Sequence, residues 1–128
     1  MRAIDTNVVV RYIIGDDAKQ SARARAVIDS GSVFVSTTVV LESEWVLRSV
    51  YGFDRDAVVN SLRAFLGLPS ISAENPHLLM EALDRAEKGM DFADALHLGA
   101  AVACEAMLTF DRRFILVAAD QSPRVAAP

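Results

Sequence analysis

Acidic side chains recur where short apolar runs of this chain give way to a turn or a helix. Asp5 directly follows the run Arg2–Ile4, and Asp111 comes just after Met107–Thr109. Two further acids lie inside segments that are otherwise apolar, Glu42 and Asp94. Carboxylates that gather repel one another unless a hard cation neutralises them, and oxygen-only ligation suits Mg²⁺ or Mn²⁺ and not zinc. These residue types therefore indicate a divalent metal site, provided that the fold brings them together.

Apolar runs, capping residues and glycine stops predict alternating strands and helices. Strands are expected at Arg2–Ile4, Val33–Val35, Ser70–Ser72 and Met107–Thr109, with an edge strand near Val125. Helices are expected after Asp5-Thr6-Asn7, over Ala18–Ser30, from Ser36–Thr38 to Tyr51, from Asp54 or Asp56 to Leu66, over Pro76–Lys88 and over Asp91–Cys104, with a helical turn at Asp111–Phe114. Strands separated by helices of this length form parallel crossovers, so the fold class is predicted to be α/β.

The predicted sheet topology brings the four acids to the same edge. In an open parallel sheet, ligands bind at the carboxyl ends of the strands, which all lie at one edge. Asp5 and Asp111 follow predicted strands directly, and the turn after Val33–Val35 leads into the helix that bears Glu42. Asp94 lies one turn inside a helix that starts from the same edge. All four are therefore expected to converge on one site.

Each acid also has an ordinary structural interpretation. Asp5 and Asp91 are good helix N-caps, and for Asp91 capping is the preferred interpretation. Asp111 suits a turn equally well, whereas Asp94 lies in a segment with the composition of a buried helix. Glu42 is expected to be buried, because the apolar residues of its helix occupy nearly the whole circumference. Periodicity alone assigns that buried position equally well to Glu44.

Length and charge limit the kinds of protein that this chain could be. The 128 residues are predicted to form one domain, 1–128, and 13 basic against 17 acidic residues give a net charge of −4. The four acids account for all of this charge, although arginine supplies enough cations for a local phosphate-binding rim. The candidates are Arg11, Arg48, Arg112 and Arg113, none of which is assigned. The longest uncharged stretch, Ser30–Leu41, is shorter than the roughly 18 residues that a membrane span needs.

Other chemistries find little support in the sequence. His77 and His97 do not have the spacing of a zinc site, and no nucleophile signature or glycine-rich phosphate loop is present. The single cysteine, Cys104, is expected in the core, and its solitary occurrence favours a reducing, cytoplasmic location. A chain that is 52% hydrophobic must bury its apolar surplus in a core or in an oligomer interface.

Four motifs together resemble a known family. They are Asp5-Thr6-Asn7, Val40-Leu41-Glu42 with Trp45-Val46-Leu47 after it, Asp91-Phe92-Ala93-Asp94-Ala95-Leu96, and Thr109-Phe110-Asp111. In this order they resemble the acidic motifs of PIN-domain proteins, and the likeness is greatest to VapC-type toxins. The resemblance covers essentially the whole chain, although the Ala118–Gln121 region matches the family's final strand only faintly.

The resemblance implies a three-layer α/β/α sandwich around a mostly parallel sheet. It implies that Asp5, Glu42, Asp94 and Asp111 are the catalytic metal ligands, and it selects Glu42 over Glu44 because the family's acid directly follows the Val-Leu pair. Asp91 would be an auxiliary carboxylate, and Thr6, Asn7 and Thr109 would orient the ligands. Family members are metal-dependent ribonucleases, usually dimeric and usually the toxin of a toxin–antitoxin pair.

The leading hypothesis is therefore a Mg²⁺-dependent endoribonuclease, with Mn²⁺ as a substitute, that is a homodimer and is inhibited by a small antitoxin. The alternative is a catalytically weak PIN-like module that binds protein or RNA. A phosphatase with Asp5 as its nucleophile is less favoured, because that chemistry normally requires a second aspartate at position 7, where this chain has Asn7.

Overall fold

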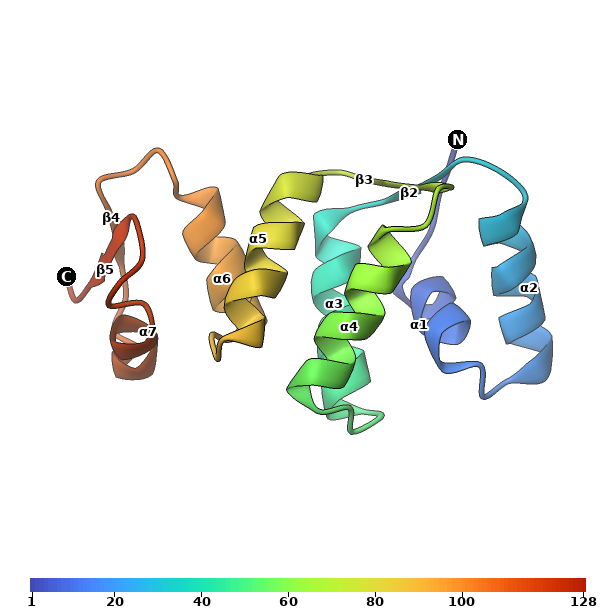
Figure 1. Ribbon diagram of the computed structural model, residues 1–128, viewed down its shortest axis with the longest axis horizontal. Coiled ribbons are helices and arrows are strands. Elements are labelled where there is room, and N and C mark those ends of the chain that lie inside the picture. Colours follow the sequence, from blue (N-terminus) through green and yellow to red (C-terminus); the bar gives the residue numbers. More distant parts are fainter. The chain divides into compact units, whose positions relative to one another are not determined.

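The computed structural model describes residues 1–128, which fold as two compact units, Met1–Pro76 and His77–Pro128 (Figure 1). The first unit contains β1 (Arg2–Ala3), α1 (Thr6–Ile14), α2 (Ala18–Asp29), β2 (Val33–Val35), α3 (Thr37–Ser49), α4 (Arg55–Leu66) and β3 (Ile71–Ala73). The second contains α5 (Pro76–Glu87), which begins at the boundary, α6 (Phe92–Ala100), β4 (Ala106–Leu108), α7 (Arg112–Val117) and β5 (Arg124–Ala126). Each unit is described by itself.

The first unit is built on a three-stranded parallel sheet in the order β1-β2-β3. Arg2 pairs with Val33 on one side of β2, and Phe34 pairs with Ser72 on the other. Parallel neighbours require helical crossovers, which α1 and α2 provide between β1 and β2, and α3 and α4 between β2 and β3. The α/β class with a parallel sheet flanked by helices is therefore confirmed.

The helices of this unit begin at the polar residues that the sequence indicated. Asp5 caps α1, Ser36 accepts a hydrogen bond from the Val39 amide at 3.3 Å, and Asp54 accepts one from the Ala57 amide at 2.9 Å. Gly15 ends α1 in the left-handed conformation, with φ of 69°, which a side chain would strain. The turn at Gly15 lets α2 pack back against α1.

The α3 helix corrects one expectation about the acids. Its buried side is formed by Val40, Ser43, Glu44 and Leu47, which share one face at the helical period. Glu42 lies on the opposite side and is exposed, so the expectation that it is buried is wrong. The buried acid is Glu44, only 8% exposed, and it accepts hydrogen bonds from Arg48 one turn later at 2.9 and 3.3 Å.

In the second unit, Leu79 and Leu83 of α5 and Leu98 of α6 are fully buried. Gly99 lets α6 lie close to α5, because a Cβ there would come within 2.5 Å of Leu78 Cδ1. β4 and β5 form a separate two-stranded parallel sheet in which Met107 pairs with Val125. The predicted strand near Val125 is therefore present.

Two details of this unit differ from the sequence expectations. α6 ends at Ala100, not at Cys104, because the alanine-rich run has too few large apolar side chains to hold a further turn against the core. Cys104 consequently lies in the connection to β4 and is exposed, so its assignment to the core is wrong. None of the helices has both the length and the apolar character required to cross a membrane.

The two faces of α3 predict losses of stability of different size on truncation. Leu47→Ala removes a side chain with no exposed surface and should lower the free energy of unfolding by about 2 to 5 kcal/mol. Trp45→Ala on the outer face, where the side chain is 53% exposed, should cost less than about 1 kcal/mol. Urea denaturation of both variants checks this, and equal losses would contradict the orientation of α3.

Candidate metal-binding site

Asp5 lies where β1 gives way to α1. Its Oδ1 accepts a hydrogen bond from the Thr6 amide at 2.7 Å, so its side chain caps the helix, as the ordinary interpretation of this residue requires. The residue is exposed, and it stands at the carboxyl end of a parallel strand. Capping fixes one carboxylate oxygen and the orientation of the group, and both are compatible with a ligand role for the other oxygen.

Thr6 joins Asp5 to Glu42. The Thr6 side chain is buried, and its hydroxyl donates a hydrogen bond to Glu42 Oε1 across the α1–α3 contact. Residues 36 positions apart in sequence are thereby held together by one side chain. The first unit consequently brings two of the predicted acids, Asp5 and Glu42, to the same place.

Glu74 is a carboxylate at this edge that the sequence analysis did not single out. It follows β3 directly, its backbone amide donates to the Val35 carbonyl at 3.0 Å, and its Oε1 accepts from the Thr37 amide at 2.9 Å. The signal that would have identified it is its position two residues after the predicted strand Ser70–Ser72. Glu74 therefore completes the hydrogen bonding at the start of α3, together with Ser36.

The second unit holds the other two predicted acids around one cavity. The cavity measures about 410 Å³ and its wall includes Asp91, Asp94, Asp111, Arg113 and Phe114. Asp91 caps α6 by accepting from the Asp94 amide at 3.1 Å. Asp111 caps α7 by accepting from the amides of Arg113 and Phe114 at 3.0 and 3.2 Å. Both of these bonds fall on Asp111 Oδ1, so Oδ2 takes neither.

The electrostatics of this cavity favour a cation. Partial burial, followed by the charges of Asp91 and Asp111, raises the pKa of Asp94 above its ordinary value, and only His97 acts against this shift. A raised carboxyl pKa means that the negative charge of Asp94 is destabilised where it stands. A bound divalent ion removes that penalty, so the donor chemistry of the cavity fits Mg²⁺ or Mn²⁺.

Thr109 and His77 have structural partners, and His97 lies on the surface. Thr109 Oγ1 accepts a hydrogen bond from the Asp111 amide at 3.0 Å, which shapes the turn that presents Asp111. His77 pairs with Glu81 at 3.1 Å on an exposed face of α5, and His97 is exposed on α6. Neither histidine supplies a zinc-like arrangement.

The four predicted ligands are thus distributed as two pairs, Asp5 with Glu42 in the first unit and Asp94 with Asp111 in the second. No group of three or more aspartate, glutamate, histidine or cysteine side chains is arranged to hold a metal ion. The joint four-carboxylate site therefore stays a prediction.

Comparison with models of protein families identifies the family of this chain. The model of the PIN domain matches residues 3–120 and so includes both units and all four acids. The chain belongs to the PIN-domain family. Members of this family are typically metal-dependent nucleases. A search of curated proteins found no match.

The Thr6–Glu42 hydrogen bond predicts energetic coupling between α1 and α3. Thr6→Val keeps the shape of the side chain and removes the donor, and Glu42→Ala removes the acceptor. In a double-mutant cycle measured by urea denaturation, the two changes should couple by about 1 kcal/mol. The matched pair Thr6→Val with Glu44→Ala should show no comparable coupling, and strictly additive effects of Thr6→Val and Glu42→Ala would contradict the contact.

Proposed function

We propose that this PIN-domain protein is a Mg²⁺-dependent endoribonuclease that hydrolyses RNA phosphodiester bonds, with Asp5, Glu42, Asp94 and Asp111 as its metal ligands. The observation that carries the proposal is the acidic cavity of the second unit, where partial burial and, after it, the neighbouring carboxylates raise the pKa of Asp94, in a chain of a nuclease family. Acids that served only as caps would be expected to stand apart, because their mutual repulsion destabilises the fold.

The chain's own residues prepare this chemistry by fixing the carboxylates. Thr6 holds Glu42, the α7 amides hold Asp111, and the α6 start holds Asp91 next to Asp94. Arg113 lies on the wall of the same cavity and supplies a guanidinium suited to a phosphate oxygen. Mg²⁺ bound to these ligands would activate a water molecule for attack and offset charge on the phosphate.

The alternative is a PIN-like module that binds RNA or protein with little catalysis. The complete set of four acids favours the nuclease, because a module that only binds has no need of clustered carboxylates that repel a phosphate backbone. Cleavage measured with purified protein decides between the two.

We expect the purified protein to cleave structured RNA in Mg²⁺ or Mn²⁺ and to lose this activity in EDTA. Asp111→Asn should reduce cleavage by at least about 100-fold, because the variant removes a ligand charge. Asparagine caps helices as well as aspartate does, so the free energy of unfolding should change by less than about 1 kcal/mol. Gel assays of RNA cleavage and urea denaturation of the same preparations measure the two effects.

Asp54→Asn is the matched control, because Asp54 caps α4 in the same way and is not among the proposed ligands. It should keep wild-type cleavage. RNA cleavage that proceeds equally well in EDTA, or equal cleavage by the Asp111→Asn and Asp54→Asn variants, would overturn the assignment of these acids to a metal site.

We further propose that the enzyme is the toxin of a toxin–antitoxin pair and that a small antitoxin protein binds it in the cytoplasm. The support is the resemblance of the whole chain, motif by motif, to VapC-type toxins. The sequence leads us to expect the binding surface near the helix that bears Glu42 and near the Val58–Leu66 helix, and the second part of this expectation has to be revised. The apolar side chains of α4, among them Val58, Leu62 and Phe65, are buried and are not offered to a partner.

A homodimer through the outer face of α3 is the corresponding assembly proposal. Trp45 on that face is 53% exposed, Val50 at the end of α3 is 63% exposed, and tryptophan is enriched among residues that dominate interface energies. Light scattering should show a dimer for the wild type, and Trp45→Ala should raise its dissociation constant by about tenfold or more. A wild-type protein that is monomeric at every accessible concentration would contradict this proposal.

A further inference from the structure

A second cavity, in the first unit, has a composition unlike that of the acidic one. It lies between α1 and α2 and measures about 350 Å³. Its polar wall is made by Asn7, Arg11, Gln20 and Arg23, and its apolar wall by Val8, Ala24 and Val27. No carboxylate lines it. The donors of this wall are amide and guanidinium groups, which bind acceptor oxygens.

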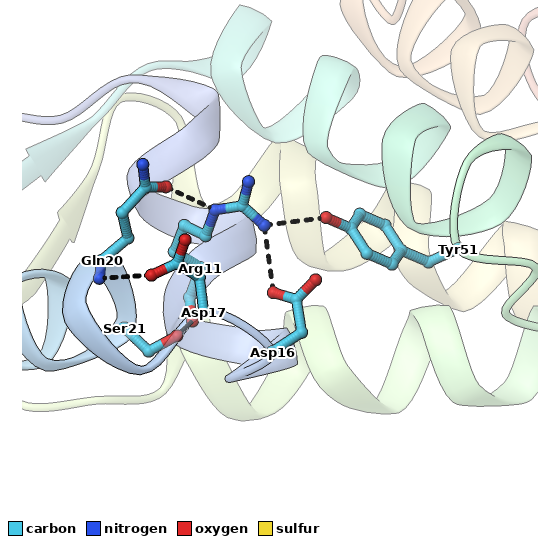
Figure 2. Close-up of polar contacts among 6 residues, drawn as sticks. All are labelled: Arg11, Asp16, Asp17, Gln20, Ser21 and Tyr51. Carbon is cyan, nitrogen blue, oxygen red and sulfur yellow. Dashed lines mark hydrogen bonds and ion pairs between the residues drawn. The ribbon is translucent and has the colours of Figure 1, made fainter.

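Arg11 is fixed in place before any ligand arrives (Figure 2). Its Nε donates to Gln20 Oε1 at 2.7 Å, and one terminal nitrogen donates to Asp16 Oδ1 and to the Tyr51 hydroxyl, each at 3.0 Å. The Arg11 carbonyl also accepts a hydrogen bond from the Ser21 hydroxyl at 3.0 Å. A side chain held by this many partners loses little conformational entropy when it binds a ligand.

The orientation of Gln20 follows from this network. An arginine can only donate, so the Gln20 atom that faces Arg11 Nε has to be the amide oxygen. The amide nitrogen of Gln20 is therefore left as a donor. In Figure 2 this nitrogen and the remaining terminal nitrogen of Arg11 point to the same side, away from Asp16. Two fixed donors from two helices thus face one direction.

Arg23 adds an uncompensated charge. It lies one turn after Gln20 on α2, its side chain is exposed, and it lines the same cavity without an acidic partner. The nearby acids are engaged elsewhere, since Asp16 pairs with Arg11 and Asp17 accepts from the Gln20 backbone amide at 3.0 Å. The cavity therefore combines a prearranged set of donors with a guanidinium that is available to an anion.

We propose that this cavity is a subsite for a backbone phosphate of the RNA substrate, separate from the acidic site where cleavage would occur. This inference rests on the proposed ribonuclease function for the identity of the ligand. Arg23 binds the phosphate as the charged partner, Arg11 and Gln20 bind its oxygens, and Val8, Ala24 and Val27 contact the adjoining sugar. Asn7 connects the cavity to the start of α1, two residues after Asp5.

The test measures RNA binding without cleavage. A short fluorescein-labelled single-stranded RNA is titrated with the protein in EDTA, and fluorescence anisotropy gives the dissociation constant. Arg23→Ala should weaken binding about five- to tenfold, since charge-assisted hydrogen bonds to phosphate are among the stronger polar contacts. The slope of log K against log salt should also fall by about 0.7, as expected when one phosphate contact is lost on a single strand.

Gln20→Glu gives a sharper variant. The new carboxylate keeps the acceptor for Arg11 Nε, so the network and the fold are retained, while the outward donor becomes a negatively charged acceptor. Binding should weaken at least as much as in Arg23→Ala. Arg25→Ala is the matched control, because Arg25 is an exposed arginine of the same helix that does not line the cavity. It should change the dissociation constant by less than about twofold.

Equal losses in Arg23→Ala and Arg25→Ala would show a diffuse electrostatic effect and would overturn the subsite, as would unchanged binding in Gln20→Glu. Thermal melts of each variant check that it is folded, and Arg23→Ala changes an exposed side chain. The two proposals fail separately. If the wild type cleaves RNA and all variants bind RNA with equal affinity, only the phosphate subsite is contradicted. If Arg23→Ala and Gln20→Glu selectively lose binding but the wild type shows no Mg²⁺-dependent cleavage, only the ribonuclease function is contradicted.

Discussion

The hydrogen bonding of β2 on both of its edges is the constraint on which the first unit depends. The Ile4 amide donates to the Phe34 carbonyl at 3.1 Å on one side, and on the other the Val33 amide donates to the Ser70 carbonyl at 2.8 Å. Because both pairings are parallel, all three strands end at one edge. Asp5, Ser36 and Glu74 follow those ends. The polar edge is thus a consequence of strand direction, and neither β1 nor β3 would place its carboxylate there without β2.

Two helix caps, Asp5 and Asp111, are also proposed metal ligands, and a third cap, Asp91, adjoins the proposed ligand Asp94. Asp5, Asp91 and Asp111 each accept from amides at the start of a helix, which contributes about 1 kcal/mol per cap. Partial burial, followed by repulsion from Asp91 and Asp111, raises the pKa of Asp94 and acts in the opposite direction. Capping offsets part of this cost, because backbone donors stabilise the carboxylates whether or not an ion is bound. The interpretations of these acids as caps and as ligands are therefore compatible, and the structure supports the first directly.

The sequence predicted the features that depend on local signals. The five strands, most helix starts and the capping residues follow from short-range patterns, and the structure has them with shifts of a few residues. The sequence could not decide which of Glu42 and Glu44 is buried. Apolar residues lie on nearly every side of this helix, so the helical period does not identify the face that packs against the core. The end of α6 and the exposure of Cys104 depend on packing that an alanine-rich run does not reveal. The Arg11–Tyr51 contact joins residues 40 positions apart, and no local pattern signals it.

Helix α1 links the two polar regions of the first unit. Thr6, Val9 and Val10 face the core, so the helix is held by its apolar side while its two ends carry different chemistry. The first turn presents Asp5 and holds Glu42, and Arg11, roughly 9 Å farther along the axis, is held by α2 and by Tyr51. A rigid helix keeps this spacing constant. A proposed metal ligand and proposed phosphate donors held by one such element cannot shift independently, so an RNA strand bound in the α1–α2 cavity would have a fixed position relative to Asp5.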